Sequence, residues 1–278
     1  MITDIQTNKL FLADSLPIKQ PRFFVRFSKV LKDCNIHFRF LPYTKDIWAV
    51  DFMPIQIRRN EFVQFTYNPD YLQSQKYRST ISDVDRICEA IKLPTTKSKL
   101  VVDGGNVIRA TDKVIMCDKV FYENKHISEK DIIKQLKELL EVDKLYFVPW
   151  DKDDFTGHVD GMVRFIDNDT VLINSYCQEK PEYQRCLRIS LHNAGLDWVE
   201  LPYNPPKDTD PDSAEGLYLN YLQMQQGVIM PTFNAKDDDT AYKVLERVFK
   251  GQTIATVDST DLSKESGVLN CISWNIVE

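Results

Sequence analysis

The sequence predicts an α/β protein in which five similar strand–strand–helix–strand units close into a ring and form one domain over residues 1–278. Three observations lead to this prediction. Two short β-rich runs, an amphipathic helix and a third apolar run recur in the same order along the chain. A polar junction follows each third run. The N-terminal copy lacks its first strand, which the C-terminal residues 268–277 (VLNCISWNIV) can supply.

The N-terminal unit is the incomplete copy. Residues 9–14 (KLFLAD) and 36–43 (IHFRFLPY) have the short apolar pattern of strands, and residues 21–33 (PRFFVRFSKVLKD) between them have the pattern of an amphipathic helix. The C-terminal strand therefore completes this unit and closes the ring.

Four complete units follow in the chain. Their paired strands, helices and third strands lie in residues 52–67, 80–93 and 99–102; 105–118, 127–142 and 144–150; 161–175, 182–195 and 196–203; and 218–233, 238–249 and 252–258. One such unit cannot bury its apolar faces alone, so each must stack on its neighbours, and a closed ring makes a single domain.

Composition narrows the function classes. The 278 residues are 43% hydrophobic and 27% charged, with a net charge of −6, so there is no broad basic face for nucleic acid, whereas an acidic cleft would attract a cation. No apolar run has the length of a signal sequence or a membrane span, so we expect a cytoplasmic protein without a membrane partner. The six cysteines lack C-x-x-C spacing, which indicates reduced thiols. Homo-oligomerisation is left open.

The junctions that follow the third strands are unusually polar. In a closed ring, equivalent junctions face a common axis at one end, so their side chains should meet. They hold, in order, Trp48 and Asp51; Asp103; His158 and Asp160; Asn220; and Cys271. One polar residue at a strand end is usually a turn residue, but recurrence at equivalent places indicates a shared site.

A cysteine, a histidine and several aspartates at one place are typical of two chemistries, a thiol nucleophile with an acid/base partner or a metal site. The other histidines fall within or beside other elements, and no Cys or His pair has zinc spacing. Residues 151–162 fail the calcium-loop pattern at Thr156 and Met162, and the Gly104-Gly105 pair lacks the third glycine of a dinucleotide-binding loop. We therefore predict neither metal nor cofactor, with a mixed Cys/His/Asp metal site as the alternative.

A guanidinium substrate explains the carboxylates. Asp51, Asp103 and Asp160 beside one thiol would raise its pKa unless a cation were present, and the planar N–H fork of a guanidinium matches carboxylate geometry. In this interpretation Cys271 attacks the guanidinium carbon and His158 protonates the departing nitrogen. Water then hydrolyses the covalent intermediate, with His158 as general base.

Five segments in the same order resemble the motifs of the agmatine deiminase and Porphyromonas-type peptidylarginine deiminase family, within the guanidino-group-modifying pentein superfamily. WAVDFMP resembles W-x-R-D-x-G-P, VVDGGNVI resembles E/D-G-G-N, and TGHVDGMVRF resembles N-G-H-x-D-G-x-x-R-F. YLNYLQMQQGVIMPTF resembles Y-x-N-F followed by V-x-V-P-x-F, and SGVLNCISW resembles the G-G-G-x-H-C-x-T-Q ending. The resemblance covers most of the chain.

This resemblance implies a five-bladed, pseudo-fivefold β/α propeller, the pentein fold of ββαβ units. It implies hydrolysis of agmatine to N-carbamoylputrescine and ammonia, as in putrescine biosynthesis, with a small cationic guanidine as the partner. The implied catalytic residues are Cys271 as nucleophile, His158 as acid/base, and Asp160 and Asp51 as ligands of guanidinium nitrogens. The implied substrate-binding residues are Asp103, Trp48, Asn220, Gly157 and Asn270.

Some positions depart from the family pattern. Val50 stands where the family usually has Arg, Asp103 where agmatine deiminases usually have Glu, and Asn270 where they usually have His. These changes leave peptidylarginine deiminase, free arginine deiminase, an amidinotransferase and an inactive pentein binding module as alternatives. A substrate carboxylate would need a basic residue, for which Arg58, Arg59, Arg109 and Arg164 are candidates, although pairing with acids of the protein is the preferred interpretation for each.

Overall fold

The computed structural model describes residues 1–152, 154–205 and 212–278. Within these ranges, the strands form five three-stranded sheets with the same topology. In every sheet the middle strand pairs antiparallel with one neighbour and parallel with the other. Parallel neighbours need a crossover connection, and helices supply it in each unit. The predicted mixed α/β fold of five repeated units is therefore confirmed.

The first sheet joins segments from the two ends of the sequence. It contains β15 (Ser273–Ile276), β1 (Lys9–Ala13) and β2 (Phe38–Leu41), and α1 (Leu16–Lys19) and α2 (Pro21–Asp33) connect β1 to β2. β1 pairs antiparallel with β15, so that Phe11 lies opposite Trp274. One short helix, η1 (Asp4–Gln6), precedes β1.

The long helix of this unit, α2, has the amphipathic pattern that the sequence predicts. α2 begins at Pro21, a position where the missing N–H of proline costs no helical hydrogen bond. Phe23, Phe27 and Leu31 follow at four-residue spacing and are fully buried. Burying side chains of this size stabilises the fold by roughly 1.5–3 kcal/mol each.

The other four units have the same plan. The second contains β3 (Ile55–Arg58), β4 (Glu61–Thr66), η2 (Asp70–Leu72), α4 (Gln75–Arg78), α5 (Val84–Ala90) and β5 (Thr96–Val101). The third contains β6 (Ile108–Arg109), β7 (Lys113–Cys117), α6 (Lys119–Glu123), α7 (Glu129–Leu140) and β8 (Lys144–Val148). The fourth contains β9 (Val163–Phe165), β10 (Thr170–Asn174), α8 (Pro181–Asn193) and β11 (Asp197–Leu201). The fifth contains β12 (Leu222–Met224), β13 (Gly227–Thr232), α9 (Asp238–Val248) and β14 (Ile254–Asp258), followed by α10 (Thr260–Ser263).

Element boundaries differ from the sequence prediction by a few residues at either end. The helix expected from residue 80 begins at Val84, because Asp83 is its N-cap and accepts a hydrogen bond from the amide of Arg86. The preceding Thr80 instead belongs to a turn, where its hydroxyl bonds the carbonyl of Tyr77.

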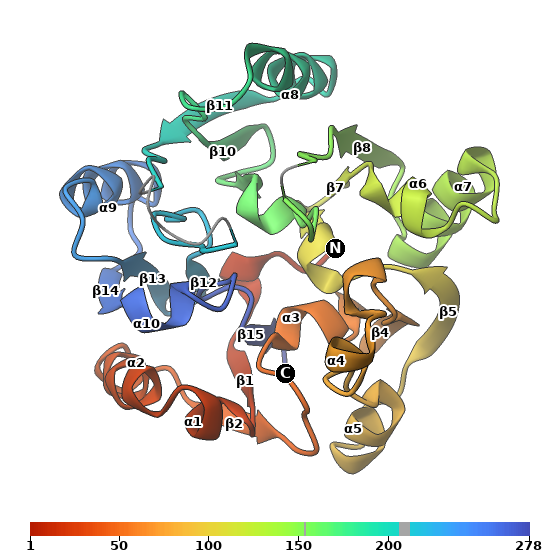
Figure 1. Cartoon of the computed structure of the whole chain (residues 1–278), viewed down its shortest axis with the longest axis horizontal. Coiled ribbons are helices and arrows are strands. Elements are labelled where there is room, and N and C mark those ends of the chain that lie inside the picture. The colour runs from red at the N-terminus through yellow and green to blue at the C-terminus, as the bar shows by residue number, and fades with distance from the viewer. Residues whose placement is uncertain (153, 206–211) are drawn as a thin grey trace.

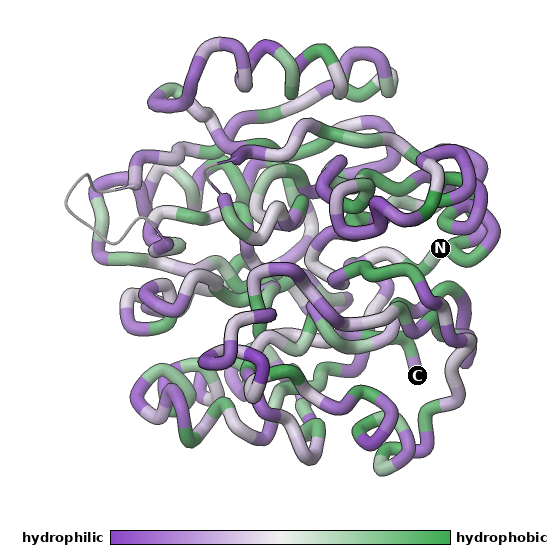
Figure 2. Tube along the Cα trace, turned by 45° about the vertical axis from the view of Figure 1, so that its right-hand side comes forward, coloured by the Kyte–Doolittle hydropathy of each residue, from purple (hydrophilic) through white to green (hydrophobic). Residues whose placement is uncertain are grey.

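Figure 1 shows the five units arranged around a common centre, with the sheets inside and α2, α5, α7, α8 and α9 at the periphery. Buried clusters of apolar side chains form between neighbouring units. For example, one cluster joins Val63 of the second unit to Val114 and Leu136 of the third. Hydrophobic residues accordingly predominate along the inner strands, whereas hydrophobic and hydrophilic residues alternate along the outer helices (Figure 2).

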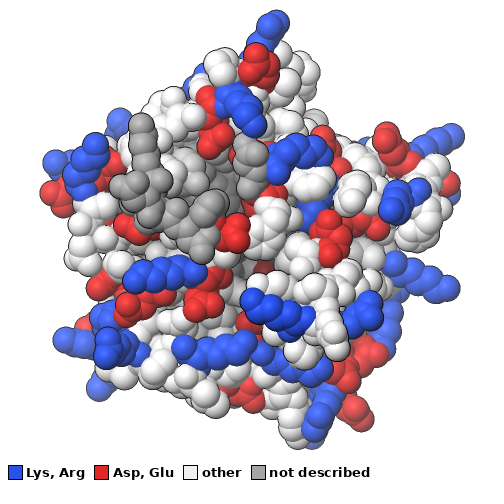
Figure 3. All heavy atoms as spheres, in the orientation of Figure 1, with Lys and Arg blue, Asp and Glu red and all other residues white. Residues whose placement is uncertain are grey.

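Charges of both signs are interspersed over the face in Figure 3, which fits the expected lack of a broad basic surface. Among the described residues, every helix is too short or too polar to cross a bilayer.

Candidate active site

A short turn precedes the first strand of each sheet, and the five turns lie next to one another. They are α3 (Ala49–Phe52), η3 (Gly104–Asn106), η4 (Val159–Gly161) and the turns at residues 217–220 and 269–272. Hydrogen bonds connect each turn to the next in a closed circuit. These contacts run from Asp51 to the amide of Gly105, from Asp103 to His158, from Asp160 to Asn220, from Asn220 to the amides of Asn270 and Cys271, and from the Cys271 carbonyl to the amide of Val50.

Three of these turns bring carboxylates to one histidine. Asp51, Asp103, Asp160 and His158, here called the carboxylate cluster, are each at most 7% exposed. His158 Nε2 lies 3.0 Å from Asp103 Oδ2, and His158 Nδ1 lies 3.4 Å from Asp51 Oδ1. Three acidic groups therefore surround a single imidazole inside the protein.

This crowding of acids changes the proton affinity of the cluster. Burial is the main reason that the pKa of Asp51 rises to about 8; His158 opposes the rise, and Asp103 and Asp160 add to it. Burial would lower the pKa of His158, but the three carboxylates outweigh burial and raise that pKa to about 10. At neutral pH the cluster thus holds an imidazolium and retains protons, because it lacks a further positive charge.

Cys271 lies beside Asp160 in the turn before β15. Its Sγ is 3.7 Å from Asp160 Oδ2, and the side chain is 8% exposed. Asn220 holds this turn, since its Oδ1 accepts the Cys271 amide at 3.2 Å while its Nδ2 donates to Asp160 Oδ2 at 3.2 Å. Burial, followed by Asp160 and Asp51, raises the pKa of the thiol well above its usual value. The thiol is therefore protonated until a cation enters.

Two glycines let the turns approach this closely. A Cβ on Gly105 would lie 2.6 Å from Asp51 Oδ1 and 2.8 Å from His158 Nδ1, and a Cβ on Gly104 would lie 2.0 Å from the Val50 carbonyl oxygen. No side chain fits at these distances. The two glycines are required by the packing of η3 against α3 and His158.

The remaining predicted site residues have different surroundings. Asn270 Nδ2 donates to Asp160 Oδ2 at 2.6 Å, so it belongs to the same network. Trp48 precedes α3 and packs against Gly267, where a Cβ would be 2.6 Å from the indole. Gly157 has a φ of +61° and faces Lys119 and Trp150.

A second charged group, here called the arginine cluster, consists of Arg109 on β6, Arg164 on β9 and Asp4 on η1. Asp4 Oδ2 accepts from Arg164 Nη2 at 2.6 Å, and Asp4 Oδ1 lies 3.4 Å from Arg109 Nη2. Arg164 is 2% exposed and also donates to the Tyr221 carbonyl at 3.1 Å.

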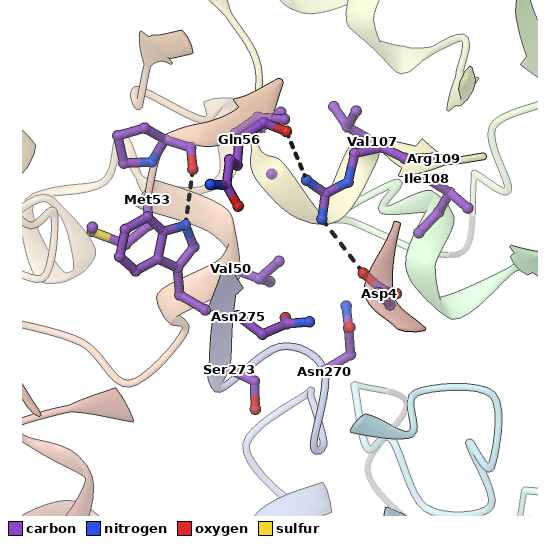
Figure 4. Close-up of a pocket in the computed structure, with 14 residues that line it drawn as sticks. Asp4, Val50, Met53, Gln56, Val107, Ile108, Arg109, Asn270, Ser273 and Asn275 are labelled. Carbon is purple, nitrogen blue, oxygen red and sulfur yellow. Dashed lines mark hydrogen bonds and ion pairs between the residues drawn. The ribbon is translucent and has the colours of Figure 1, made fainter. Parts of the chain in front are cut away.

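A cavity of about 40 Å³ lies beside the arginine cluster, and its lining does not include Cys271 or the residues of the carboxylate cluster. Asp4 and Arg109 line it together with Val50 and Asn270, which are neighbours of Asp51 and Cys271 (Figure 4). Since Asp4 forms ion pairs with Arg109 and Arg164, neither guanidinium is free to bind a substrate carboxylate. Arg58 and Arg59 bind Glu141 and the Glu278 carbonyl, so all four arginines follow the preferred interpretation of pairing within the protein.

Comparison with known sequences decides the family. The sequence model of the Porphyromonas-type peptidyl-arginine deiminase family matches residues 16–276. The chain belongs to this family. Its carboxylate cluster and Cys271 all lie inside the matched range.

Individual relatives and solved structures are similar to this chain in sequence and in fold. The agmatine deiminase of Pseudomonas aeruginosa strain UCBPP-PA14 is 24% identical over 204 residues, covering 62% of this chain and 54% of the relative. This chain thus spans little more than half the length of the curated relatives that it matches. The agmatine deiminase of C. jejuni has a similar fold, with a TM-score of 0.83 at 20% identity, and the match covers 100% of this chain and 95% of that one. A DDAH from Pseudomonas aeruginosa, in complex with citrulline, matches with a TM-score of 0.63 at 14% identity over 98% and 100% of the chains.

Two further residues of this family member surround the site and were missed in the sequence. The Tyr71 hydroxyl donates to Asp103 Oδ2 at 2.8 Å, and Lys119 Nζ, whose side chain is 1% exposed, forms a 2.8 Å ion pair with Asp70. The sequence around each resembles an ordinary polar surface segment, and neither belongs to a repeated junction. A buried lysine can be recognised only from the packing around it.

Proposed function

We propose that this chain is a hydrolase that deiminates a small guanidine, in first place agmatine, to N-carbamoylputrescine and ammonia through a covalent cysteine intermediate. One observation carries the proposal: three buried carboxylates lie around one imidazole beside the Cys271 thiol, and Asp103 Oδ1 is buried without a hydrogen-bond partner among the described residues. An unsatisfied buried acceptor costs roughly 1–3 kcal/mol or more if charged. A cationic donor would remove that cost.

A guanidinium meets this requirement better than an ammonium or a metal ion. Its planar N–H groups bind several carboxylates at once, and its carbon is the electrophile that a thiolate attacks. Within the described ranges, no three His, Cys, Asp or Glu side chains have a metal-binding arrangement. We assign Asp51, on α3, and Asp160, on η4, as the carboxylates that bind the guanidinium nitrogens.

Binding of the cation prepares the nucleophile. Burial and the nearby Asp160 and Asp51 hold the Cys271 thiol in its neutral form. A guanidinium between these carboxylates and the sulfur compensates their charge, so the thiol proton is released to solvent and the thiolate forms only when substrate is present. The substrate therefore switches on the group that attacks it.

The chemical steps then follow from the protonation of His158. Cys271 Sγ bonds to the guanidinium carbon, and the imidazolium, whose pKa of about 10 keeps it charged, gives a proton to the nitrogen that leaves as ammonia. Its Nδ1 faces Asp51, so the nitrogen held by Asp51 is the one that departs. Water enters in place of ammonia and loses a proton to the neutral imidazole. The new tetrahedral species expels the thiolate and leaves a ureido product.

The basic residues near the site favour a substrate without a carboxylate. Arg109 and Arg164 are bound to Asp4, and Lys119 is bound to Asp70 and to the carbonyls of Phe155 and Thr156. Free arginine would need a cation for its α-carboxylate, which these groups do not offer. Agmatine, which lacks that carboxylate, fits the site better, and the names of the relatives support the same choice.

We also propose that residues 1–278 are one deiminase domain and that its five units are the blades of a five-bladed β/α propeller. The closed circuit of hydrogen bonds through all five turns supports this architecture, as does the pairing of β15 with β1. In such an arrangement the site residues lie in the equivalent turns of the blades.

A direct assay tests the function. The native protein is incubated with agmatine, arginine, an arginine peptide and methylated arginine, and ammonia and ureido product are measured. We expect turnover of agmatine at a kcat/KM at least tenfold above that of arginine. If agmatine binds but no guanidine is turned over, the chain is a binding module, and if arginine is preferred the substrate assignment is wrong.

A further inference from the structure

Tyr71 lies on η2, in the second unit, and its side chain reaches the carboxylate cluster. Asp51 precedes the first strand of the same unit. Its hydroxyl donates to Asp103 Oδ2 at 2.8 Å and lies 3.4 Å from His158 Nε2. The rings of Tyr71 and His158 meet edge to face, with their centroids 6.1 Å apart. Tyr71 therefore touches both members of the Asp103–His158 pair.

The two oxygens of Asp103 have different surroundings. Oδ2 accepts from Tyr71 and His158, which fills both of its lone pairs, whereas Oδ1 is buried and has no hydrogen-bond partner in the part of the chain that the structure describes. Rotation of the carboxylate would exchange the two oxygens. The two donors on Oδ2 oppose that rotation, so Oδ1 keeps its free position.

Tyr71 is itself fixed by groups outside the cluster. Lys119 Nζ lies 4.9 Å from the centre of its ring, and the Phe155 ring packs edge-on with a centroid distance of 5.4 Å. Lys119 also donates to the carbonyls of Phe155 and Thr156 at 2.7 and 2.9 Å. One buried ammonium thus holds Tyr71 and the segment before His158 together.

We propose that Tyr71 is a positioning residue of the reaction: its hydroxyl fixes the Asp103 carboxylate so that Oδ2 orients His158 and Oδ1 is presented to the guanidinium. This inference rests on the proposed deiminase function. The role depends on the short side chain of Asp103. Its carboxylate is held against rotation by the hydrogen bonds with Tyr71 and His158. The charged and titratable groups that face this pair are Asp51, Asp160, Asp70, Tyr67, Lys119 and Glu123.

The test compares Tyr71→Phe with Tyr218→Phe. Tyr218 lies in the turn at residues 217–220, but its hydroxyl donates to Asp238 on α9, at 2.8 Å, and so provides the same kind of hydrogen bond outside the carboxylate cluster. We expect Tyr71→Phe to raise KM and lower kcat for agmatine, each by about tenfold, as for a lost hydrogen bond to a charged group. In the pH profile of kcat, the apparent pKa of the high-pH limb should rise by about half a unit, because the Asp103 carboxylate then holds the imidazolium proton more strongly. Tyr218→Phe should lower thermal stability without moving that limb.

A double-mutant cycle separates positioning from general packing. Agmatine affinity is measured by calorimetry in a Cys271→Ala background with Tyr71→Phe, Asp103→Asn and both together. If Tyr71 acts through Asp103, its replacement should cost less than threefold once Asp103 is already asparagine. Additive losses, or a Tyr71→Phe enzyme with the native KM and pH profile, would overturn the inference while leaving the deiminase function intact.

Failure of the function itself has a different signature. If the native protein turns over no guanidine, the proposed function is wrong, and the His158 imidazole titration followed by NMR then decides the role of Tyr71. An unchanged titration in Tyr71→Phe would reject the contact with the Asp103–His158 pair. A shift in Tyr71→Phe and none in Tyr218→Phe would support it.

Discussion

The carboxylate cluster and the arginine cluster are opposites in charge and in completeness. In the first, three aspartates surround one imidazole, and in the second, two guanidinium groups share one carboxylate. Asp4 already binds Arg164 at 2.6 Å, which is the kind of bond that we assign to substrate in the other cluster. The arginine cluster thus has one carboxylate of the chain for two cations, whereas the carboxylate cluster has one imidazolium for three acids and can accept a further cation.

The difference separates stability from activity. A charge pair completed within the protein contributes to folding, and its loss leaves a buried charge unpaired. A cluster with an excess of buried like charge opposes folding, and a bound cation relieves that cost. Equivalent substitutions in the two clusters should therefore have opposite effects.

The largest effect is expected at the nucleophile. Replacement of Cys271 by Ala should lower kcat by at least about 10⁴-fold, because the covalent route is lost. Agmatine affinity should remain within about threefold of the native value, since the carboxylates that bind the cation are retained. Calorimetry on the variant and ammonia release measure the two quantities, and appreciable residual turnover would exclude Cys271 as the nucleophile.

The next effect distinguishes the carboxylate cluster. Asp51→Asn should lower kcat/KM for agmatine by roughly 10²- to 10³-fold, since a buried partner of the cation is removed. The same variant should be more stable than the native protein at pH 9 in the absence of ligand, because a carboxylate repelled by Asp103 and Asp160 is neutralised. Steady-state kinetics and urea unfolding test both parts, and a loss of stability at pH 9 would contradict the comparison.

The matched change in the arginine cluster is Asp4→Asn. It leaves Arg109 and Arg164 without their carboxylate and should lower the free energy of unfolding by about 3 kcal/mol. kcat/KM for agmatine should stay within about twofold of the native value below the unfolding temperature. Urea unfolding and the ammonia assay measure these outcomes. A large kinetic defect in a folded Asp4→Asn protein would show that the clusters are not separable.

The smallest effect concerns pH. The pKa of Asp51 rises from 3.8 to about 8 on folding and that of His158 from 6.5 to about 10, so the folded state binds more protons than the unfolded state. The contribution of Asp51 is lost as the pH rises toward 8, and that of His158 as it rises from 6.5 through 10. The ligand-free protein should therefore lose stability between pH 6 and pH 9. Urea unfolding at the two pH values, with and without agmatine, tests this sign, and saturating agmatine should reduce the loss.

The sequence predicted the repeated units and the junction residues because both depend on local patterns. The helix expected at residues 21–33 is α2 (Pro21–Asp33), and its buried face follows from four-residue spacing. Asp51, Asp103, His158, Asp160 and Cys271 were found because they recur just before the first strand of successive units. Their grouping in one network follows from the topology, and their catalytic roles remain proposals.

The residues that were missed act across units and have no periodic signal. Asp4 lies in an N-terminal segment that looked unremarkable, and it pairs with Arg164 across 160 positions of sequence. Lys119 has the composition of a surface residue, yet it is buried against Phe155 and Asp70. Such partners are chosen by the three-dimensional arrangement, which a pattern of hydrophobic spacing does not encode.

The pairing of β1 with β15 has a consequence for how the protein folds. The Asn275 side chain donates a hydrogen bond to the Thr7 hydroxyl across 268 positions of sequence. Contacts at such a separation are among the slowest to form, so the first sheet should form late. Cys271 lies in the turn just before β15, so the thiol joins its aspartates only when the two most distant strands meet. A folding intermediate with the other four units assembled would carry the acids and the histidine but no positioned nucleophile. Catalytic competence would then appear as a late kinetic phase, after most of the secondary structure has formed.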